Sequence, residues 1–189
     1  MKTAIKRFAL LCATLVPFTP AVAEDPAAVQ FSMLELNAPD RRNVKGLRFS
    51  LLYGETGNVS GLDLALGLSE VDSMTGVSFP VIVGGNRVSG EFKGLAVGLA
   101  NIHEGSDTGV NIGLLNLTND VNGISVGLAN ISSGDTLADI SAVNISEESS
   151  FQLAFFNKTG TIRGVQIGFL NCADNGFFPC FPIINFAAN

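Results

Sequence analysis

The sequence predicts an all-β protein, a β-solenoid of about nine short rungs with a cap at each end. The composition is neither helical nor disordered, because 21 of the 189 residues are Gly and only 15% are charged. A unit of about 14 residues recurs along most of the chain. Within each unit, apolar residues alternate with small or polar ones, which is the period of a β-strand.

Residues 1–23 have the pattern of a secretory signal peptide. A basic start (Lys2, Lys6, Arg7) precedes an apolar stretch, and Ala21-Val22-Ala23 forms a cleavage site of small residues. We therefore expect an exported protein of the periplasm, outer membrane or cell surface of a Gram-negative bacterium. Removal of the leader takes away three basic residues and no acidic one, so the formal charge changes from −6 to −9. Such an acidic chain lacks the basic surface that nucleic-acid binding requires.

Residues 24–45 contain one strand-like stretch followed by a turn rich in charged residues. The stretch runs from Val29 to Leu36, and Asp40, Arg41 and Arg42 lie in the turn. A stack of rungs exposes its first rung unless another segment covers it. We expect this segment to be an N-terminal strand and cap.

Residues 46–172 form the repeat domain. Its units start at Gly46, Gly61, Gly76, Gly94, Gly109, Gly123, Leu137, Ser150 and Gly164. The second, fourth and sixth residues of a unit are apolar, as in Leu95, Val97 and Leu99. We interpret these residues as the buried face of each strand, which places the mostly polar third residue of each unit on the outside.

The eighth residue of six consecutive units is Asn. These residues are Asn101, Asn116, Asn130, Asn144, Asn157 and Asn171. An Asn amide can both donate to and accept from an identical Asn one strand spacing away, about 4.8 Å. We therefore predict an internal Asn ladder at one corner of the solenoid. The first three units depart from the pattern, with Tyr53, Leu68 and Val83 at this position.

The alternative fold is an antiparallel meander, or a small outer-membrane β-barrel acting as an anchor or channel. Strands of about nine residues have the right length for it. Two observations count against it. Trp is absent and Tyr53 is the single Tyr, so the aromatic girdles of a membrane barrel are missing. Hairpin connections would also give a period of about 28 residues rather than about 14.

Residues 173–189 are rich in Phe and Pro and predict a C-terminal cap over the last rung. Cys172 and Cys180 flank a short loop and favour a disulfide in an oxidising compartment, the alternative being two free buried thiols. The segment could instead insert into a membrane or a partner.

The units resemble the "surface repeat" proteins of bacterial cell envelopes. The resemblance is carried by the pattern in Gly109 to Asn116, Gly123 to Asn130 and Gly164 to Asn171, and by the Phe/Pro-rich end. It covers about residues 46–186. It implies an exported envelope protein without established chemistry, and it provides no catalytic residue to transfer to this chain.

We find no catalytic, cofactor or metal motif in the sequence. Asp107-Thr108-Gly109 is one copy of a motif that aspartic proteases need twice, and we interpret His103 as part of a solvated turn. The seventh residues of the later units suggest an apolar interaction stripe: Leu115, Ala129, Val143, Phe156 and Leu170. We therefore expect a non-enzymatic structural or binding protein without a cofactor, whose partner is a protein, an envelope surface or a second copy.

Overall fold

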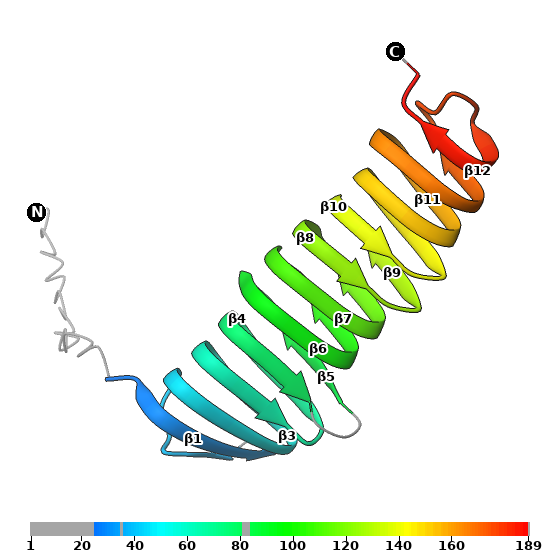
Figure 1. Cartoon of the computed structure of the whole chain (residues 1–189). Helices are drawn as coiled ribbons and strands as arrows, with labels where there is room; N and C mark the ends of the chain where they lie inside the picture. Colours follow the sequence, from blue (N-terminus) through cyan, green and yellow to red (C-terminus); the bar gives the residue numbers. More distant parts are fainter. Residues whose placement is uncertain (1–24, 35, 81–83, 189) are drawn as a thin grey trace, which may run out of the picture.

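The computed structural model describes residues 25–34, 36–80 and 84–188, and it shows a β-solenoid of about eight turns (Figure 1). No helix occurs in these ranges. The predicted all-β solenoid is therefore confirmed, with about eight turns in place of nine. The predicted signal peptide, residues 1–23, lies outside the described residues.

Within the described residues, twelve strands form one continuous sheet that winds around the solenoid axis. They are β1 (Ala27–Leu34), β2 (Leu36–Ala38), β3 (Asn43–Ala65), β4 (Leu68–Pro80), β5 (Gly85–Val88), β6 (Phe92–His103), β7 (Ser106–Thr118), β8 (Asp120–Val126), β9 (Ala129–Ser132), β10 (Asp135–Ile140), β11 (Val143–Ala173) and β12 (Cys180–Phe186).

Successive turns pair in parallel, which overturns the alternative of an antiparallel meander or barrel. Among the described strands, antiparallel pairing is confined to the ends, between β1 and β2 and between β11 and β12. Equivalent residues of neighbouring units lie in register, as Gly94, Gly109 and Gly123 do. One sequence unit is thus one turn of the solenoid.

Both ends of the stack are closed by extra segments. At the N-terminal end, β1 pairs in parallel with β3, and β2 folds back along it. The buried Gln30 donates to the carbonyls of Pro39 and Arg41 at 3.2 and 2.6 Å. At the C-terminal end, β12 runs antiparallel to the last turn, and the predicted Cys172–Cys180 disulfide joins the two.

The interpretation of the apolar second, fourth and sixth residues as the buried face is wrong, because these side chains point outward. Leu114 and Leu128 are 58% and 60% exposed, whereas Asn111 and Ser125, from the third position, are 1% exposed. The reason is the narrowness of the coil. A Cβ added at Gly113 would lie 2.9 Å from both the Asn101 amide nitrogen and the Gly98 carbonyl oxygen. At this fifth position of the unit the interior has no room for a methyl group, so it cannot hold Leu or Phe there.

The buried apolar core is small and lies mainly in the first turns. Its main cluster consists of Val44, Val59, Val71, Met74, Val88, Phe92 and Ala96, and a few buried apolar residues such as Val121 and Ile162 lie in later turns. Elsewhere the interior is filled largely by polar side chains. Burial of apolar surface therefore stabilises one end of the solenoid, and hydrogen bonding becomes more important along the rest.

Candidate functional site

The outer face of the segments that follow each unit start is a candidate binding surface. We call these segments the first wall: residues 46–51, 61–66, 76–80, 94–99, 109–114, 123–128, 137–142, 150–155 and 164–169. Each first-wall segment is followed by a corner, at which two successive side chains, such as Leu114 and Leu115, both point outward. The segments that follow these corners form the second wall, and they begin with residues such as Asn116. Polar side chains between the walls position this outer face.

The six predicted asparagines lie in one hydrogen-bonded column between the walls. Each amide nitrogen donates to the amide oxygen of the next Asn, as from Asn101 to Asn116 at 2.6 Å and from Asn116 to Asn130 at 2.7 Å. The column continues through Asn144 and Asn157 to Asn171. All six side chains are buried. The ladder fixes the register between turns, since a slip of one residue would break every rung of it.

The ladder contains one residue that sequence reasoning missed. Asn86 donates to the Asn101 amide oxygen at 2.7 Å, and Gly54 and Ser69 occupy the same column in the preceding turns. The unit that starts at Gly76 is longer than the others, so counting eight residues forward from that Gly reaches Val83, outside the described residues. Counting one unit back from Asn101 would have found Asn86.

Replacing Asn130 by Ala is expected to destabilise the protein by about 2–3 kcal/mol. The Asn130 amide donates to the Ser125 carbonyl at 2.9 Å and to Asn144 at 3.1 Å, and it accepts from Asn116 at 2.7 Å. Urea unfolding measures the loss. Asn122→Ala, at an exposed position outside the ladder, is the control. Equal unfolding midpoints for the two variants would remove the ladder from this account.

The third-position residues form a second buried column, so they cannot be the polar outer surface that the sequence suggested. The column includes Asn111, Ser125, Asp139, Gln152 and Gln166. Asp139 accepts a hydrogen bond from Thr136 Oγ1 at 2.6 Å. Burial raises the pKa of Asp139 to about 6, although hydrogen bonds from Thr136, Gln152 and Ser149 favour the charged form.

Asp139→Asn is expected to stabilise the protein by about 2–3 kcal/mol at pH 7 and to change little at pH 4. The folded pKa of Asp139, about 6, exceeds the unfolded value of about 3.9. Its favourable contribution is therefore complete below about pH 4 and is lost as the pH rises through about 6.

Urea unfolding of the wild type and of Asp139→Asn at pH 4, 5, 6 and 7 tests this pH dependence. The exposed Asp135, which pairs with Arg163 at 2.8 Å, provides the control substitution Asp135→Asn. An advantage of Asp139→Asn that is the same at every pH would contradict the assignment.

A buried ion pair occupies the interior near the N-terminal end. Arg48 Nη1 lies 3.4 Å from Asp63 Oδ1, and both side chains are at most 1% exposed. Arg48 also donates to Ser69 at 2.8 Å and to Ser32 at 3.2 Å, and Ser69 donates to Asp63. Burial lowers the pKa of Arg48 and raises that of Asp63, while each charge opposes the shift of the other.

His103 is buried, which corrects the interpretation of it as part of a solvated turn. The residue is 2% exposed, and its ring packs on Phe92 with the ring centroids 4.7 Å apart. Nδ1 lies 2.6 Å from Asp107 and Nε2 lies 2.7 Å from the Asn86 amide oxygen. The Asp107 carboxylate therefore supports the interior packing of the turns and does not face a cleft.

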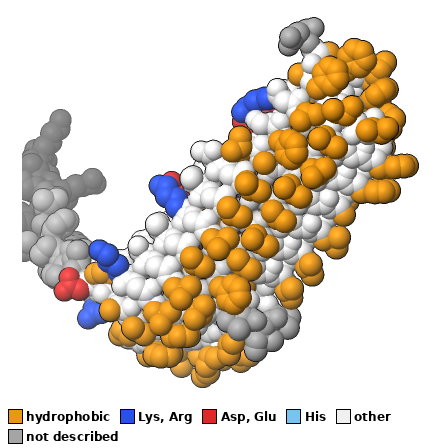
Figure 2. All heavy atoms as spheres, in the orientation of Figure 1, with side chains coloured by type: hydrophobic (Ala, Val, Ile, Leu, Met, Phe, Trp, Pro, Cys, Tyr) orange, Lys and Arg blue, Asp and Glu red, His pale blue; other side chains and the backbone are white. Residues whose placement is uncertain are grey.

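The outward face of the first wall is apolar in every described turn (Figure 2). Its columns include Leu99 at 43%, Ile112 at 41% and Phe169 at 69% exposure. Charged side chains gather along one edge of this face (Figure 2). Arg163 and Lys93, which directly precede two unit starts, form ion pairs with Glu148 and Glu91. The molecule is thus amphipathic across its width, with a continuous apolar face that is unusual for a monomer.

The predicted stripe of seventh residues lies at the corner that borders this face. Leu115, Ala129 and Val143 are in register and half-buried, Phe156 is half-buried, and Leu170 is 37% exposed. The structure therefore places the stripe beside the first wall, where it widens the apolar surface. Sequence reasoning missed the larger part of this surface because it assigned the first wall to the core.

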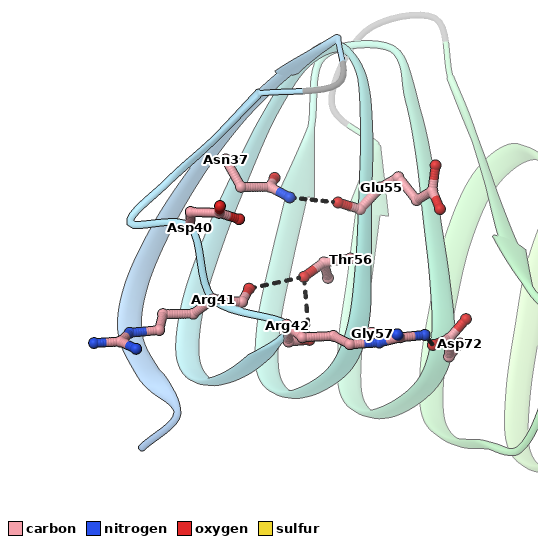
Figure 3. Close-up of a pocket in the computed structure, with 8 residues that line it drawn as sticks. All are labelled: Asn37, Asp40, Arg41, Arg42, Glu55, Thr56, Gly57 and Asp72. Atoms are coloured by element: carbon pink, nitrogen blue, oxygen red, sulfur yellow. Dashed lines mark hydrogen bonds and ion pairs between the residues drawn. The ribbon is translucent and has the colours of Figure 1, made fainter. Parts of the chain in front are cut away.

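A polar hollow lies near the N-terminal end, beside β2 and the residues that follow it (Figure 3). Arg42 pairs with Asp72 at 3.0 Å, Asn37 donates to the Glu55 carbonyl at 2.9 Å, and Thr56 donates to the carbonyl of Arg42 at 3.3 Å. These contacts attach the end segment to the first turns. We assign the hollow this structural role.

Three further findings bear on the site, and the last of them is the comparison with known proteins. Within residues 25–34, 36–80 and 84–188, no three His, Cys, Asp or Glu side chains gather as metal ligands. The same residues include no helix suited to crossing a bilayer. Comparison with protein-family models, with curated proteins and with solved structures finds no match.

Proposed function

We propose that the chain is an exported, non-enzymatic repeat protein of the cell envelope that acts as a scaffold and binds through the apolar face of its first wall. The observation that carries this proposal is the outward columns of that wall, which are apolar in each described turn. The leader-like residues 1–23 and the resemblance to surface repeat proteins support the location.

The architecture suits a binding scaffold. Interior hydrogen bonds and the two end segments hold the turns in register, so the outward side chains form regular columns. A rigid face needs little ordering when a partner binds, which favours affinity. The charged edge remains available to water when the apolar face is covered (Figure 2).

Expression of the full chain in a Gram-negative host, followed by fractionation, tests the proposal. We expect a mature chain that begins at Glu24 and is recovered with the envelope. Replacing Ile112, at the centre of the apolar face, by Lys should lower the envelope-associated fraction and increase the freely soluble periplasmic fraction. An uncleaved chain in the cytoplasm would overturn export, and an unchanged distribution of Ile112→Lys would overturn the binding role.

A further inference from the structure

The apolar face is large enough to form a stable protein interface. Its columns run in register along the stack and continue into both end strands, since Phe31 of β1 lies beside Phe49 and Ile184 of β12 lies beside Ile167. The nine first-wall segments and the two end strands make eleven layers, whose ten spacings of about 4.8 Å give a length of about 48 Å, and five residues across give about 13 Å. The product, about 600 Å² before the ridges are counted, approaches the roughly 800 Å² that each partner buries in a standard complex.

The chemistry of the face fits another apolar sheet better than it fits lipid. The chain has no Trp and one Tyr, so it lacks the aromatic anchors found at bilayer interfaces. That residue, Tyr53, donates to Glu70 at 2.9 Å. The outward columns of the first wall carry no charged side chain in the described turns, so a second copy would meet no like charge there despite the net charge of −6.

Ridges and hollows on the face are complementary to each other. Near the N-terminal end, a hollow is lined by Phe49, Leu51, Leu64 and Leu66. Near the C-terminal end, the stacked rings of Phe155 and Phe169 form a ridge, with centroids 4.9 Å apart and exposures of 66% and 69%. Counted from the two end strands, the hollow and the ridge lie at matching distances from the turn that contains Ile112.

We infer that the partner of the first wall is a second copy of this chain, packed face to face with the two solenoid axes antiparallel. A two-fold axis that passes near Ile112 and runs along the strands turns each column onto itself. It places the Phe155–Phe169 ridge of each copy over the hollow of the other. The interface is then a sheet-on-sheet packing of two apolar walls. This inference rests on the proposed function, because it names the partner of the same surface.

Analytical ultracentrifugation of the purified mature chain without detergent tests the inference. We expect a dimer at micromolar concentration, and Ile112→Lys should weaken dimerisation by about 100-fold or more because the two lysines would meet near the axis. Ile131→Lys is the matched control, since Ile131 is 39% exposed against 41% for Ile112 but lies on the second wall. The dissociation constant of the Ile131→Lys dimer should rise by less than about threefold relative to the wild type.

Two mixing experiments test the arrangement. Ile112→Lys and Ile112→Glu should each be monomeric, and a mixture of them should form a heterodimer. Leu51→Cys mixed with Phe169→Cys should form a disulfide-linked pair under mild oxidation, whereas neither variant should do so alone. Circular dichroism verifies that each variant keeps its β structure.

Three results would overturn the inference. These are a monomeric wild type, equal weakening by Ile112→Lys and Ile131→Lys, and transfer of a monomer to phosphatidylcholine vesicles. A monomeric protein that still associates with the envelope in an Ile112-dependent way would refute self-association while leaving the proposed function intact.

Discussion

Replacing Asp63 by Ala is expected to destabilise the solenoid by about 3–5 kcal/mol. Among the described residues, the substitution leaves the Arg48 guanidinium in the interior with Ser32 and Ser69 as its remaining hydrogen-bond partners. A buried charge without a counter-charge carries its desolvation cost uncompensated. Urea unfolding at pH 7 measures the effect.

The double variant Arg48→Gln/Asp63→Asn separates the cost of the unpaired charge from the value of the pair. Later turns carry neutral Asn111, Gln152 and Gln166 in the same column, so the interior accepts amides there. We expect the double variant to be much more stable than Asp63→Ala and close to the wild type. If both variants lost the same free energy, the unpaired charge would not be the cause.

The contrast between this ion pair and the Asn ladder shows which features of the fold can be predicted from the sequence. The ladder and the solenoid could be predicted because an amide column repeats with the period of the turn, and that period is visible in the sequence. Arg48 and Asp63 stand at the third position of the first two units, where most later units carry an uncharged residue, so no repeating pattern marked them as interior partners. They are buried because the third position faces inward, and the sequence alone did not show that orientation.

The orientation of the strands could not be read from alternation alone. A period of two separates two faces without stating which one is buried, and the usual assumption assigns the apolar face to the core. The fifth residue of the unit carried the missing signal. It is Gly at 98, 113, 127 and 168, and Ala at 65 and 154, so the coil has no room for Leu or Phe at this position. Side-chain volume along a column therefore identifies the interior of a narrow coil.

Gly109→Ala is expected to destabilise the protein by more than about 3 kcal/mol. Gly109 has a φ of +142°, a conformation that L-residues with a Cβ rarely adopt. An added Cβ would also lie 1.9 Å from the Gly94 carbonyl oxygen of the preceding turn. That oxygen cannot move away without disturbing the register in which Gly94 pairs with Gly109. The expected result is a large drop in the urea midpoint.

Gly160→Ala is the control for the Gly109 prediction, because it adds the same methyl group elsewhere in the stack. Its nearest neighbour would be the Glu147 carbonyl oxygen at 2.9 Å, a milder contact, and Gly160 is not among the residues with positive φ. We expect a clearly smaller loss of stability for Gly160→Ala. Similar losses at both positions would mean that the general cost of replacing Gly in a strand, rather than the positive φ and the close Gly94 contact at Gly109, determines the result. A larger loss at Gly109 would identify this position as one at which the close stacking of the turns requires glycine.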